Sequence, residues 1–285
     1  MSAYLELTKP RITMFILMSA AIGFLCGAHA GAQWNLWTVL HGMIGTALIA
    51  SGTAALNQWY ERSADAKMNR TKARPIPSGR VTPAQAFWFG MGIAAIGLVE
   101  LSLGANALTG ALGLFTMVSY LCVYTPLKQR SPISTTIGAI PGAMPPLIGY
   151  AAAAGKLTAE AWVLYAILFL WQFPHFYAIA WMYREDYARA GIRMLPVVEP
   201  DGESTARRIW LFSLALIPVS ILPRFFGAEG NVYAAGAIAL GVVFLWSGVR
   251  AQIERTRPRA RQVLLASVVY LPLLYGLLVL DHRGF

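Results

Sequence analysis

The stretch WTVLHGMIGTALIASGTAALNQWYERSADAKMNRTKARPIPSGR (residues 37–80) joins two kinds of sequence that rarely adjoin in a soluble protein. Residues 37–56 contain no Asp, Glu, Lys or Arg, whereas residues 57–80 contain eight of them. The first part is long enough to cross a hydrocarbon core, which takes about 20 apolar residues in a helix. The stretch therefore predicts a membrane helix whose charged continuation lies at one edge of the bilayer.

The same pattern recurs along the whole chain of 285 residues, which is 57% hydrophobic and 13% charged and has a mean hydropathy of +0.54. Such a composition is too apolar for an ordinary soluble domain. We predict an all-α polytopic membrane protein that forms a single transmembrane domain over residues 1–285. The nine expected spans are about 12–29, 37–57, 84–104, 107–125, 133–154, 160–182, 208–223, 231–249 and 262–280. The first span lacks a clear cleavage site and is too long for a signal-peptide core, so we expect it to be retained.

Lys and Arg are distributed very unequally between the loops. If alternate loops face the same side, 20 of the 23 basic residues lie on one side, and Lys156, Arg224 and Arg283 lie on the other. The positive-inside rule then predicts a cytoplasmic N-terminus and a C-terminus on the opposite side, in a bacterial-type inner membrane. The net charge of +10 also suits an anionic leaflet or an anionic substrate. No nucleic-acid-binding motif is present, so we expect no nucleic-acid partner.

Three polar side chains follow one another at helical intervals where the second span ends. Asn57, Glu61 and Asp65 stand at positions i, i+4 and i+8, so they share one face if the helix continues past the bilayer edge. Amide and carboxylate oxygens are hard ligands, and Mg²⁺ is commonly held by one or two carboxylates together with substrate phosphates. We therefore predict a Mg²⁺ site on this face.

Basic residues gather close to this candidate metal site. They are Lys67, Arg70, Lys72, Arg74 and Arg80 in the following turn, with Arg11 at the start of the first span and Lys128 after the fourth. A metal next to cations is the pairing that diphosphate chemistry requires, because both stabilise charge on the leaving group. The alternative is that these segments are solvated loops whose charges only set the membrane orientation, and for Lys128 we weigh the two readings equally.

The sixth span contains a proline and a histidine among aromatic residues. Pro174 removes one backbone hydrogen bond and predicts a kink, next to which stands His175. Its aromatic neighbours are Trp171, Phe173, Phe176, Tyr177 and Trp181. These rings either wall an apolar substrate and shield a cation by their π faces, or form ordinary core. His175 is likewise either a ligand or a packing residue.

Two further segments are expected on the same side of the membrane. Glu185 and Asp186 follow the sixth span and, together with the first acidic group, would hold one diphosphate through two or more metals. The alternative is a plain charged helix end. Residues 138–146 (GAIPGAMPP) predict an irregular or broken helix, which is tolerated at this depth only where it lines a cavity.

These motifs together resemble the UbiA superfamily of intramembrane prenyltransferases, whose members carry an N-x-x-x-D-x-x-x-D type motif after the second helix and a second acidic motif after the sixth. The resemblance covers nearly the whole chain and implies nine helices in a bundle around a central cavity. The segments LTKPRIT (7–13), NRTKARPIPSGRV (69–81), YTPLKQRSPISTTIGAIPGAMPPLIGY (124–150) and WQFPHFYAIAWMYREDYARAGIRMLPVV (171–198) are similar to the branch that transfers a farnesyl group to protohaem IX.

The resemblance implies farnesyl diphosphate and protohaem IX as substrates, Mg²⁺ as cofactor, and haem O and diphosphate as products. It implies catalytic roles for Asn57, Glu61, Asp65 and Asp186, metal binding by these four and Glu185, diphosphate binding by Arg11, Lys72, Arg74 and Lys128, and haem binding by His175, Trp171 and Tyr177. Membrane lipid and a downstream haem-modifying enzyme are the implied partners.

Two departures from the superfamily pattern affect the metal site. Glu61 stands where the superfamily usually has Asp, and the additional methylene still allows metal binding. Tyr183 and Tyr187 stand where a D-x-x-x-D pattern would place acids, which puts a full second metal set in doubt.

Two other functions fit the sequence. One is a UbiA-type prenyltransferase that acts on a quinone or chlorin precursor. The other is a transporter or a non-catalytic haem chaperone, which has no need of Asn57, Glu61 and Asp65 at helical spacing beside a basic turn. Release of diphosphate that depends on Mg²⁺ separates the second class from the enzymes.

Overall fold

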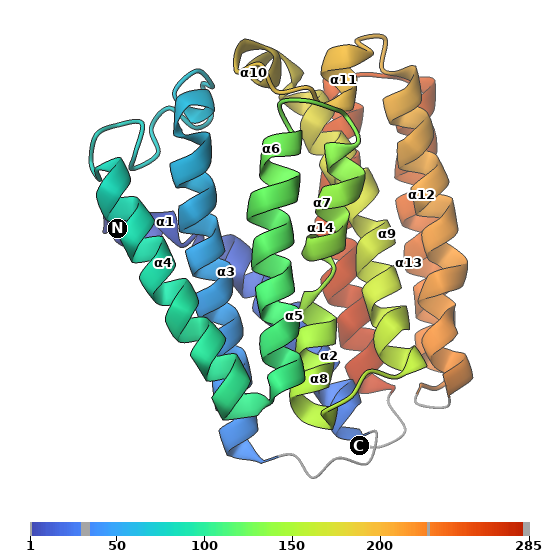
Figure 1. The fold of residues 1–285 in the computed structure, drawn as a ribbon. Helices are drawn as coiled ribbons and strands as arrows, with labels where there is room; N and C mark the ends of the chain where they lie inside the picture. Colours follow the sequence, from blue (N-terminus) through green and yellow to red (C-terminus); the bar gives the residue numbers. More distant parts are fainter. Residues whose placement is uncertain (1, 30–34, 227–228, 282–285) are drawn as a thin grey trace.

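The computed structural model describes residues 2–29, 35–226 and 229–281, and all regular elements in these ranges are helices. Nine helical segments in the described chain are long and apolar enough to cross a membrane, which confirms the all-α polytopic prediction. They form one bundle (Figure 1). Their bounds are α2 (Pro10–His29); α3 (Leu36–Asp65); α4 (Pro83–Val99) with η1 (Glu100–Ala105); α5 (Ala107–Val118) with η2 (Ser119–Tyr124) and α6 (Thr125–Leu127); α7 (Ser134–Gly142) with α8 (Pro145–Ala154); α9 (Ala159–Met182); α12 (Glu203–Ile221) with η3 (Leu222–Phe226); α13 (Asn231–Ile253); and α14 (Arg257–Leu280).

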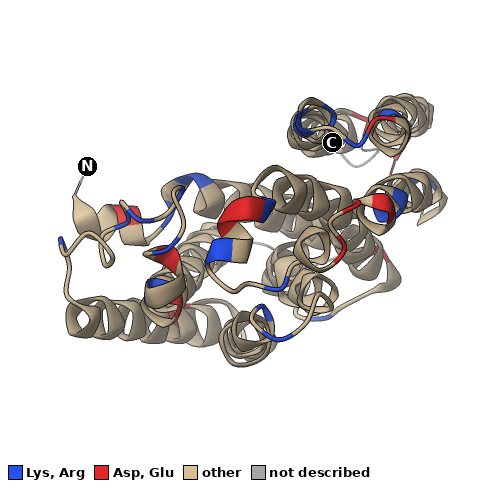
Figure 2. Ribbon diagram, turned by 90° about the horizontal axis from the view of Figure 1, so that it is seen from above, with Lys and Arg blue, Asp and Glu red and all other residues tan. Residues whose placement is uncertain are grey.

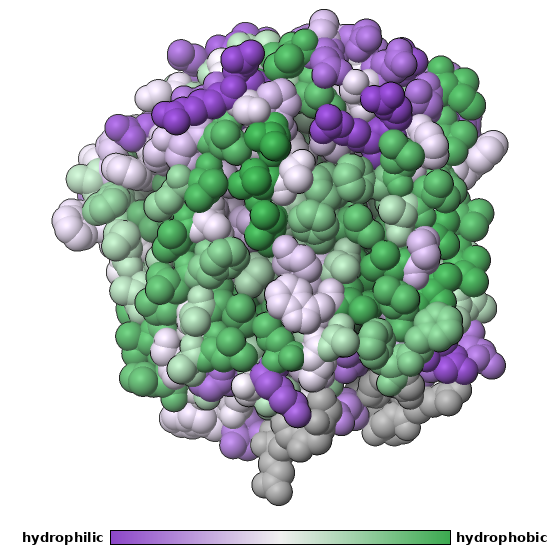
Figure 3. Space-filling view, turned by 45° about the vertical axis from the view of Figure 1, so that its right-hand side comes forward, coloured by the Kyte–Doolittle hydropathy of each residue, from purple (hydrophilic) through white to green (hydrophobic). Residues whose placement is uncertain are grey.

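The surface divides into an apolar belt and a charged end. Hydrophobic side chains cover the middle of the bundle, while hydrophilic residues concentrate at one end (Figure 3). Viewed onto that end, Lys, Arg, Asp and Glu cluster on the short helices and loops (Figure 2). Large apolar side chains such as Trp88, Leu103 and Leu280 are more than two-thirds exposed, as residues that face lipid are. The chain is therefore an integral membrane protein, and we call its charged end the basic end.

Three short helices lie outside the nine spans. One is α1 (Ala3–Leu7), which packs against α3 below the level of the other two in Figure 1. The others, α10 (Arg184–Arg189) and α11 (Leu195–Val198), lie at the basic end. The segment 66–82 also lies there and turns the chain from α3 into α4. Gly79, at φ 75°, makes a turn that side chains disfavour, and Thr82 then starts α4 with a reciprocal capping box to Gln85.

The helix α3 continues to Asp65, eight residues past the predicted end of its span at residue 57. The prediction of the span used hydropathy alone, and hydropathy falls where the polar residues begin. The backbone nevertheless stays helical, which confirms the assumption that Asn57, Glu61 and Asp65 lie on one continuous helix.

The predicted break in the fifth span is present. The helix α7 ends at Gly142 and α8 begins at Pro145, where prolines lack the N–H that a continuous helix needs. The Gln172 side chain of α9 donates to the Ala139 carbonyl at 3.2 Å, which supports this irregular segment. Pro174, in contrast, does not end α9, which stays helical as far as Met182.

Close helix packing brings α8 deep into the bundle. A Cβ atom on Gly149 would lie 1.8 Å from the Ala20 carbonyl oxygen, so only glycine lets the backbones of α2 and α8 approach this closely. The span formed by α7 and α8 is the most buried of those in the described chain, with 72% of its residues inside. It therefore forms one wall of the interior rather than part of the lipid-facing surface.

The predicted side of the C-terminus and of Arg283 concerns residues 282–285, which lie outside the described residues. The last described helix, α14, starts at the basic end and runs to the other end of the bundle (Figure 1).

Candidate active site

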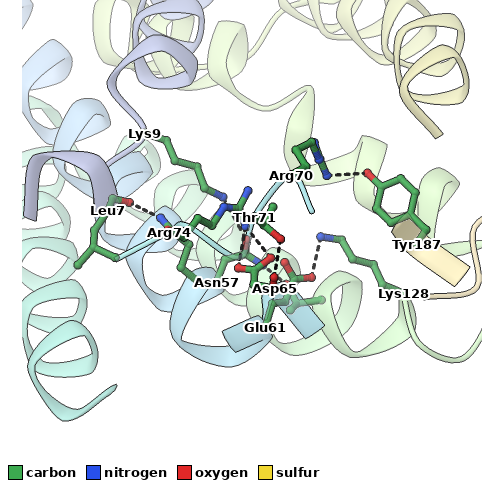
Figure 4. Close-up of polar contacts among 12 residues, drawn as sticks. Leu7, Lys9, Asn57, Glu61, Asp65, Arg70, Thr71, Arg74, Lys128 and Tyr187 are labelled. Carbon is green, nitrogen blue, oxygen red and sulfur yellow. Dashed lines mark hydrogen bonds and ion pairs between the residues drawn. The ribbon is translucent and has the colours of Figure 1, made fainter. Parts of the chain in front are cut away.

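The end of α3 presents Asn57, Glu61 and Asp65 to the interior of the basic end (Figure 4). Their exposed fractions are 1%, 8% and 0%. Burying two carboxylates is unfavourable unless each is paired with a cation or a metal. We call these three residues the α3 trio.

A basic residue from a different segment meets each member of the trio. Lys9 Nζ donates to Asn57 Oδ1 at 3.2 Å, and Lys128 Nζ donates to Glu61 Oε1 at 2.8 Å. Arg74 Nη1 donates to both oxygens of Asp65, at 2.8 and 2.7 Å. The site therefore gathers two carboxylates, one amide and three cations from four segments of the chain.

Lys9 lies in the turn between α1 and α2. Its φ of 49° is in the left-handed region, which residues other than glycine seldom adopt. The Gln58 amide holds this turn against α3 by donating to the Leu7 carbonyl at 2.9 Å. Burial, together with the nearby Arg74, lowers the pKa of Lys9 to about 7, so its positive charge is easily lost near neutral pH.

Lys128 follows α6 and lies between an acid and an aromatic ring. Its Nζ is 4.5 Å from the ring centroid of Tyr124 as well as 2.8 Å from Glu61. Burial alone would lower the pKa of Lys128, but the Glu61 carboxylate raises it well above its ordinary value. Lys128 therefore stays charged, and its backbone carbonyl also accepts from the Arg193 amide at 2.8 Å, which ties it to the segment after α10.

The second acidic motif meets the same region, but through a different contact from the one expected. The Asp186 carboxylate accepts from the backbone N–H of Asn69 at 3.4 Å and of Arg70 at 3.2 Å, and it also pairs with Arg189. Arg70 in turn donates to the Tyr187 hydroxyl at 3.1 Å and lies over the ring of Tyr183 at 4.9 Å. The residues around α10 therefore hold the segment 66–82 in place.

The predicted metal ligands of the two motifs lie apart in the structure. Within the described chain, no three His, Cys, Asp or Glu side chains are grouped as ligands of one ion. Asp186 is engaged with backbone amides and with Arg189, and Glu185 is exposed on α10. The structure thus brings the two acidic motifs to the same end, but it does not merge them into one carboxylate cage.

Two of the four expected diphosphate contacts stand at the trio and two do not. Arg74 and Lys128 contact Asp65 and Glu61 directly, whereas the side chains of Arg11 and Lys72 are exposed and make no hydrogen bond or ion pair within the described residues. Lys9 was not among the predicted site residues. A lysine immediately before the Pro10 that opens a membrane span was the signal that could have identified it.

A cavity of about 140 Å³ extends from Lys9 into the membrane part of the bundle. Its walls are mostly apolar and come from α2, α3, α5, η1, η2 and the break between α7 and α8. They are Lys9, Ile12, Thr13, Ile16, Thr46, Ile49, Ala50, Thr53, Ala54, Leu101, Thr116, Tyr120, Pro141, Gly142, Pro145 and Ile148. An apolar chain lying there would carry its polar head at the trio.

The donor set of the trio fits Mg²⁺. An amide oxygen and two carboxylates on consecutive turns of a rigid helix are hard oxygen ligands, and Mg²⁺ needs only one or two carboxylates when phosphate and water complete its shell. The Asn57 amide is oriented by its Nδ2, which donates to Thr125 Oγ1 at 3.3 Å, so that Oδ1 points toward Lys9.

The residues expected around haem fall on two sides of α9. His175 Nδ1 lies 2.8 Å from Ser267 Oγ, and the imidazole stacks on Trp171 with centroids 4.8 Å apart. Tyr177 is buried on another face, where its hydroxyl accepts from Arg208 at 3.0 Å. At about 100° per residue, Tyr177 lies roughly 200° from His175. His175 and Trp171 therefore share a face, and Tyr177 does not.

A membrane bundle with paired acids and bases at one end, and an apolar cavity that reaches one of these bases, is the architecture of an intramembrane enzyme. The chain belongs to the UbiA prenyltransferase family, which it matches over residues 16–271.

Two relatives and two solved structures illustrate this membership. The chain is 60% identical to a protoheme IX farnesyltransferase of Solibacter usitatus, with both sequences fully covered, and 46% identical to one of Koribacter versatilis, over 98% of this chain and 93% of that one. A structure described as digeranylgeranylglyceryl phosphate synthase is similar with a TM-score of 0.81 at 17% identity, over 98% of this chain and 97% of that chain. A UbiA homologue of Archaeoglobus fulgidus bound to GPP and Mg²⁺ gives 0.73 at 17% identity, over 98% and 100%. The last two comparisons concern the fold, which they confirm.

Proposed function

We propose that this enzyme transfers the farnesyl group of farnesyl diphosphate to a vinyl group of protohaem IX, with addition of water, to give haem O and diphosphate. Two full-length relatives are named for this substrate pair. The observation that carries the proposal is the α3 trio with its three cations, one of which, Lys9, also lines an apolar cavity. This arrangement accommodates a diphosphate and an isoprenoid tail at the same time.

Charge complementarity supports diphosphate binding at the trio. Glu61 and Asp65 carry two negative charges, and Lys9, Arg74 and Lys128 carry up to three positive ones, so the side chains together are close to neutral. A diphosphate would draw these cations from the carboxylates to its own oxygens. Asn57, Glu61 and Asp65 would then hold Mg²⁺, which supplies the remaining neutralisation of the leaving group when bound.

The cavity supports binding of the farnesyl tail. Its lining runs along α3 from Ala54 back to Thr46, which is about 12 Å of helix at 1.5 Å per residue. Tyr120 and Thr53 lie with Lys9 among the residues that line it. A tail in this position keeps its first carbon at the edge of the trio and excludes water from the carbon–oxygen bond that breaks.

The transfer step follows from this placement. The bond between the first farnesyl carbon and the diphosphate oxygen breaks, and both electrons leave with the oxygen, where Lys9, Arg74 and Lys128 stabilise the charge. The π electrons of the haem vinyl group form the new carbon–carbon bond. The resulting cation lies next to the macrocycle, which delocalises it. Water then adds its oxygen to that carbon and loses a proton.

The face of α9 that carries Trp171 and His175 supports haem binding. The His175 imidazole is half-buried and stacks on the Trp171 indole. A flat aromatic ligand would find apolar partners in this part of the bundle. We assign His175 to positioning of the haem, as a ligand of the iron. Tyr177 would act indirectly, because its hydroxyl accepts from Arg208 of α12 and so holds α9 in position.

The basic end is proposed to face the cytoplasm, as the positive-inside rule requires, in the inner membrane of a bacterium. Both substrates and the product are amphipathic, so the surrounding lipid is a further partner. A haem-modifying enzyme that accepts haem O directly is the proposed next partner.

The proposed function is tested with purified protein in lipid nanodiscs, supplied with protohaem, farnesyl diphosphate and Mg²⁺ in water enriched in ¹⁸O. Mass spectrometry is expected to show a porphyrin heavier by one farnesyl group and one labelled water. A farnesylated quinone or chlorin precursor, with no product from protohaem, would instead favour another acceptor. Haem binding or movement without any diphosphate release would favour a chaperone or transporter.

A further inference from the structure

We infer that Ser267 holds His175 in the tautomer protonated on Nδ1, which leaves Nε2 to ligate a haem iron and makes Ser267 a positioning residue for the haem substrate. The inference rests on the haem site of the proposed function. It follows from the hydrogen bonds that join α9 to α14.

The Ser267 hydroxyl takes part in two hydrogen bonds. It lies 2.6 Å from the Leu264 carbonyl oxygen and 2.8 Å from His175 Nδ1. A carbonyl can only accept, and a hydroxyl has one hydrogen, so the Ser267 hydrogen is used on Leu264. Nδ1 of His175 must then be the donor to Ser267 Oγ. The proton of the neutral imidazole is thereby placed on Nδ1, and Nε2 carries the lone pair.

The Nε2 atom is free to use that lone pair. It makes no hydrogen bond in the described chain, and it is not one of the buried polar atoms there that lack a partner, so it retains accessible surface. His175, Phe176 and Ile179 are all partly exposed on this side of α9, although the helix is central in the bundle. A partly exposed imidazole with one available nitrogen, among apolar side chains, suits the iron of a porphyrin.

The orientation of the ring is fixed as well as its tautomer. Trp171 stacks on the imidazole at an interplanar angle of 23°, and its Nε1 donates to the backbone carbonyl of the same Ser267 at 2.8 Å. Ser267, a fully buried serine on α14, therefore anchors both the His175 imidazole and the Trp171 indole that stacks on it. Such an outer partner is what orients histidine ligands in metal sites generally.

His175 lies near the level of the diphosphate site along α9. Ala180, five residues after His175, packs in one cluster with Ala64 and Met68, which flank Asp65. Five residues of helix span about 7.5 Å. His175 is therefore close to the level of the trio along the α9 axis, although Ala180 lies roughly 140° around the helix from it.

The inference is tested by titrating protohaem alone, without farnesyl diphosphate or Mg²⁺, into nanodisc-embedded protein and recording its absorption spectrum. The wild type is expected to give the saturable spectrum of an imidazole-ligated haem, and His175→Ala is expected to lose it. Ser267→Ala is expected to weaken binding by about tenfold or more, because loss of such an outer partner releases the tautomer and the ring. Ser220→Ala, which removes another fully buried hydroxyl, bonded to Tyr270 at 2.7 Å, is the matched control and should bind as wild type.

A double-variant cycle separates positioning from a general packing effect. If Ser267 acts through His175, adding Ser267→Ala to His175→Ala changes haem binding no further. Equal weakening in both backgrounds, or no weakening in either, overturns the inference. An unchanged spectrum in His175→Ala overturns the iron ligand itself. Because no farnesyl donor is present, failure of the transfer assay leaves these results intact.

Discussion

Lys9 Nζ lies 3.2 Å from Asn57 Oδ1, although 48 residues separate them in the chain. This contact joins the turn before the first membrane helix to the end of the second. It also places a lysine at the mouth of the apolar cavity, which Lys9 itself lines. The turn is thus positioned to contact the head of any substrate whose tail enters the bundle.

Replacement of Lys9 by Met is expected to lower kcat/KM for farnesyl diphosphate by about ten- to a hundredfold, because a hydrogen bond to a charged group contributes about 1.5–3 kcal/mol. Lys9→Arg should recover part of this loss. Steady-state transfer rates at varied farnesyl diphosphate measure the effect. Lys156→Met, which removes an exposed lysine from the opposite end, is the control and should be unaffected. Equal rates for the Lys9→Met variant and wild type would remove Lys9 from the site.

Replacement of Asp186 by Ala is expected to loosen the segment 66–82. The backbone amides of Asn69 and Arg70 lose their acceptor, and an unmet hydrogen bond of this kind destabilises by about 1–3 kcal/mol. Hydrogen–deuterium exchange of a peptide that covers these amides should accelerate, while peptides from α13 stay unchanged. Asp201→Ala, at an exposed position, serves as the control. Unaltered exchange in the Asp186 variant would show that the carboxylate does not hold this segment.

Narrowing the cavity should change the preferred tail length. Ala50 lines the cavity on α3, and Ala50→Phe would fill part of its 140 Å³. We expect a raised KM for farnesyl diphosphate and a smaller effect on geranyl diphosphate, whose tail is one isoprene unit shorter. Competition between the two donors, with products resolved by mass, measures the shift. Val99→Phe, a lipid-facing change, should leave the ratio as in wild type. If the Ala50 variant also leaves the ratio unchanged, the tail binds elsewhere.

Removal of divalent cations should distinguish the diphosphate site at the trio from the haem site at His175. Chelation with EDTA is expected to abolish diphosphate release, because the trio then lacks the ion that neutralises the leaving group. Haem titration should be unaffected, since His175 and Ser267 involve no member of the trio. Readdition of Mg²⁺ should restore the rate. Transfer that persists in EDTA at the wild-type rate would show that the cations of the protein suffice alone.

The sequence predicts the membrane spans and the α3 trio because both depend on local patterns. Hydropathy locates each span, with the largest error at the end of α3, which continues eight residues further. The spacing of Asn57, Glu61 and Asp65 requires only that α3 continue. The i, i+4 relation likewise places Trp171 beside His175. The same helical geometry puts Tyr177 on another face, although the three residues were predicted to bind haem together.

The partners of these residues are not local, and sequence reasoning missed them. Lys9 contacts Asn57, 48 residues away, and Ser267 contacts His175, 92 residues away. Both contacts depend on which helices pack together, and hydropathy does not predict that. Asp186 was expected at a metal because acids near a diphosphate site favour that interpretation. Its contacts with two backbone amides depend on how the segment 66–82 folds back, which no periodicity encodes.

The central claim is that the α3 trio drives loss of diphosphate from an isoprenoid whose tail lies in the cavity. The most direct test compares diphosphate release with haem O formation in the wild type and in Asp65→Asn, which keeps the shape of the side chain but removes its charge. We expect one diphosphate per haem O in the wild type, and a loss of at least a hundredfold in both products in the variant, with the protein still folded. Wild-type rates of both in Asp65→Asn would contradict the account.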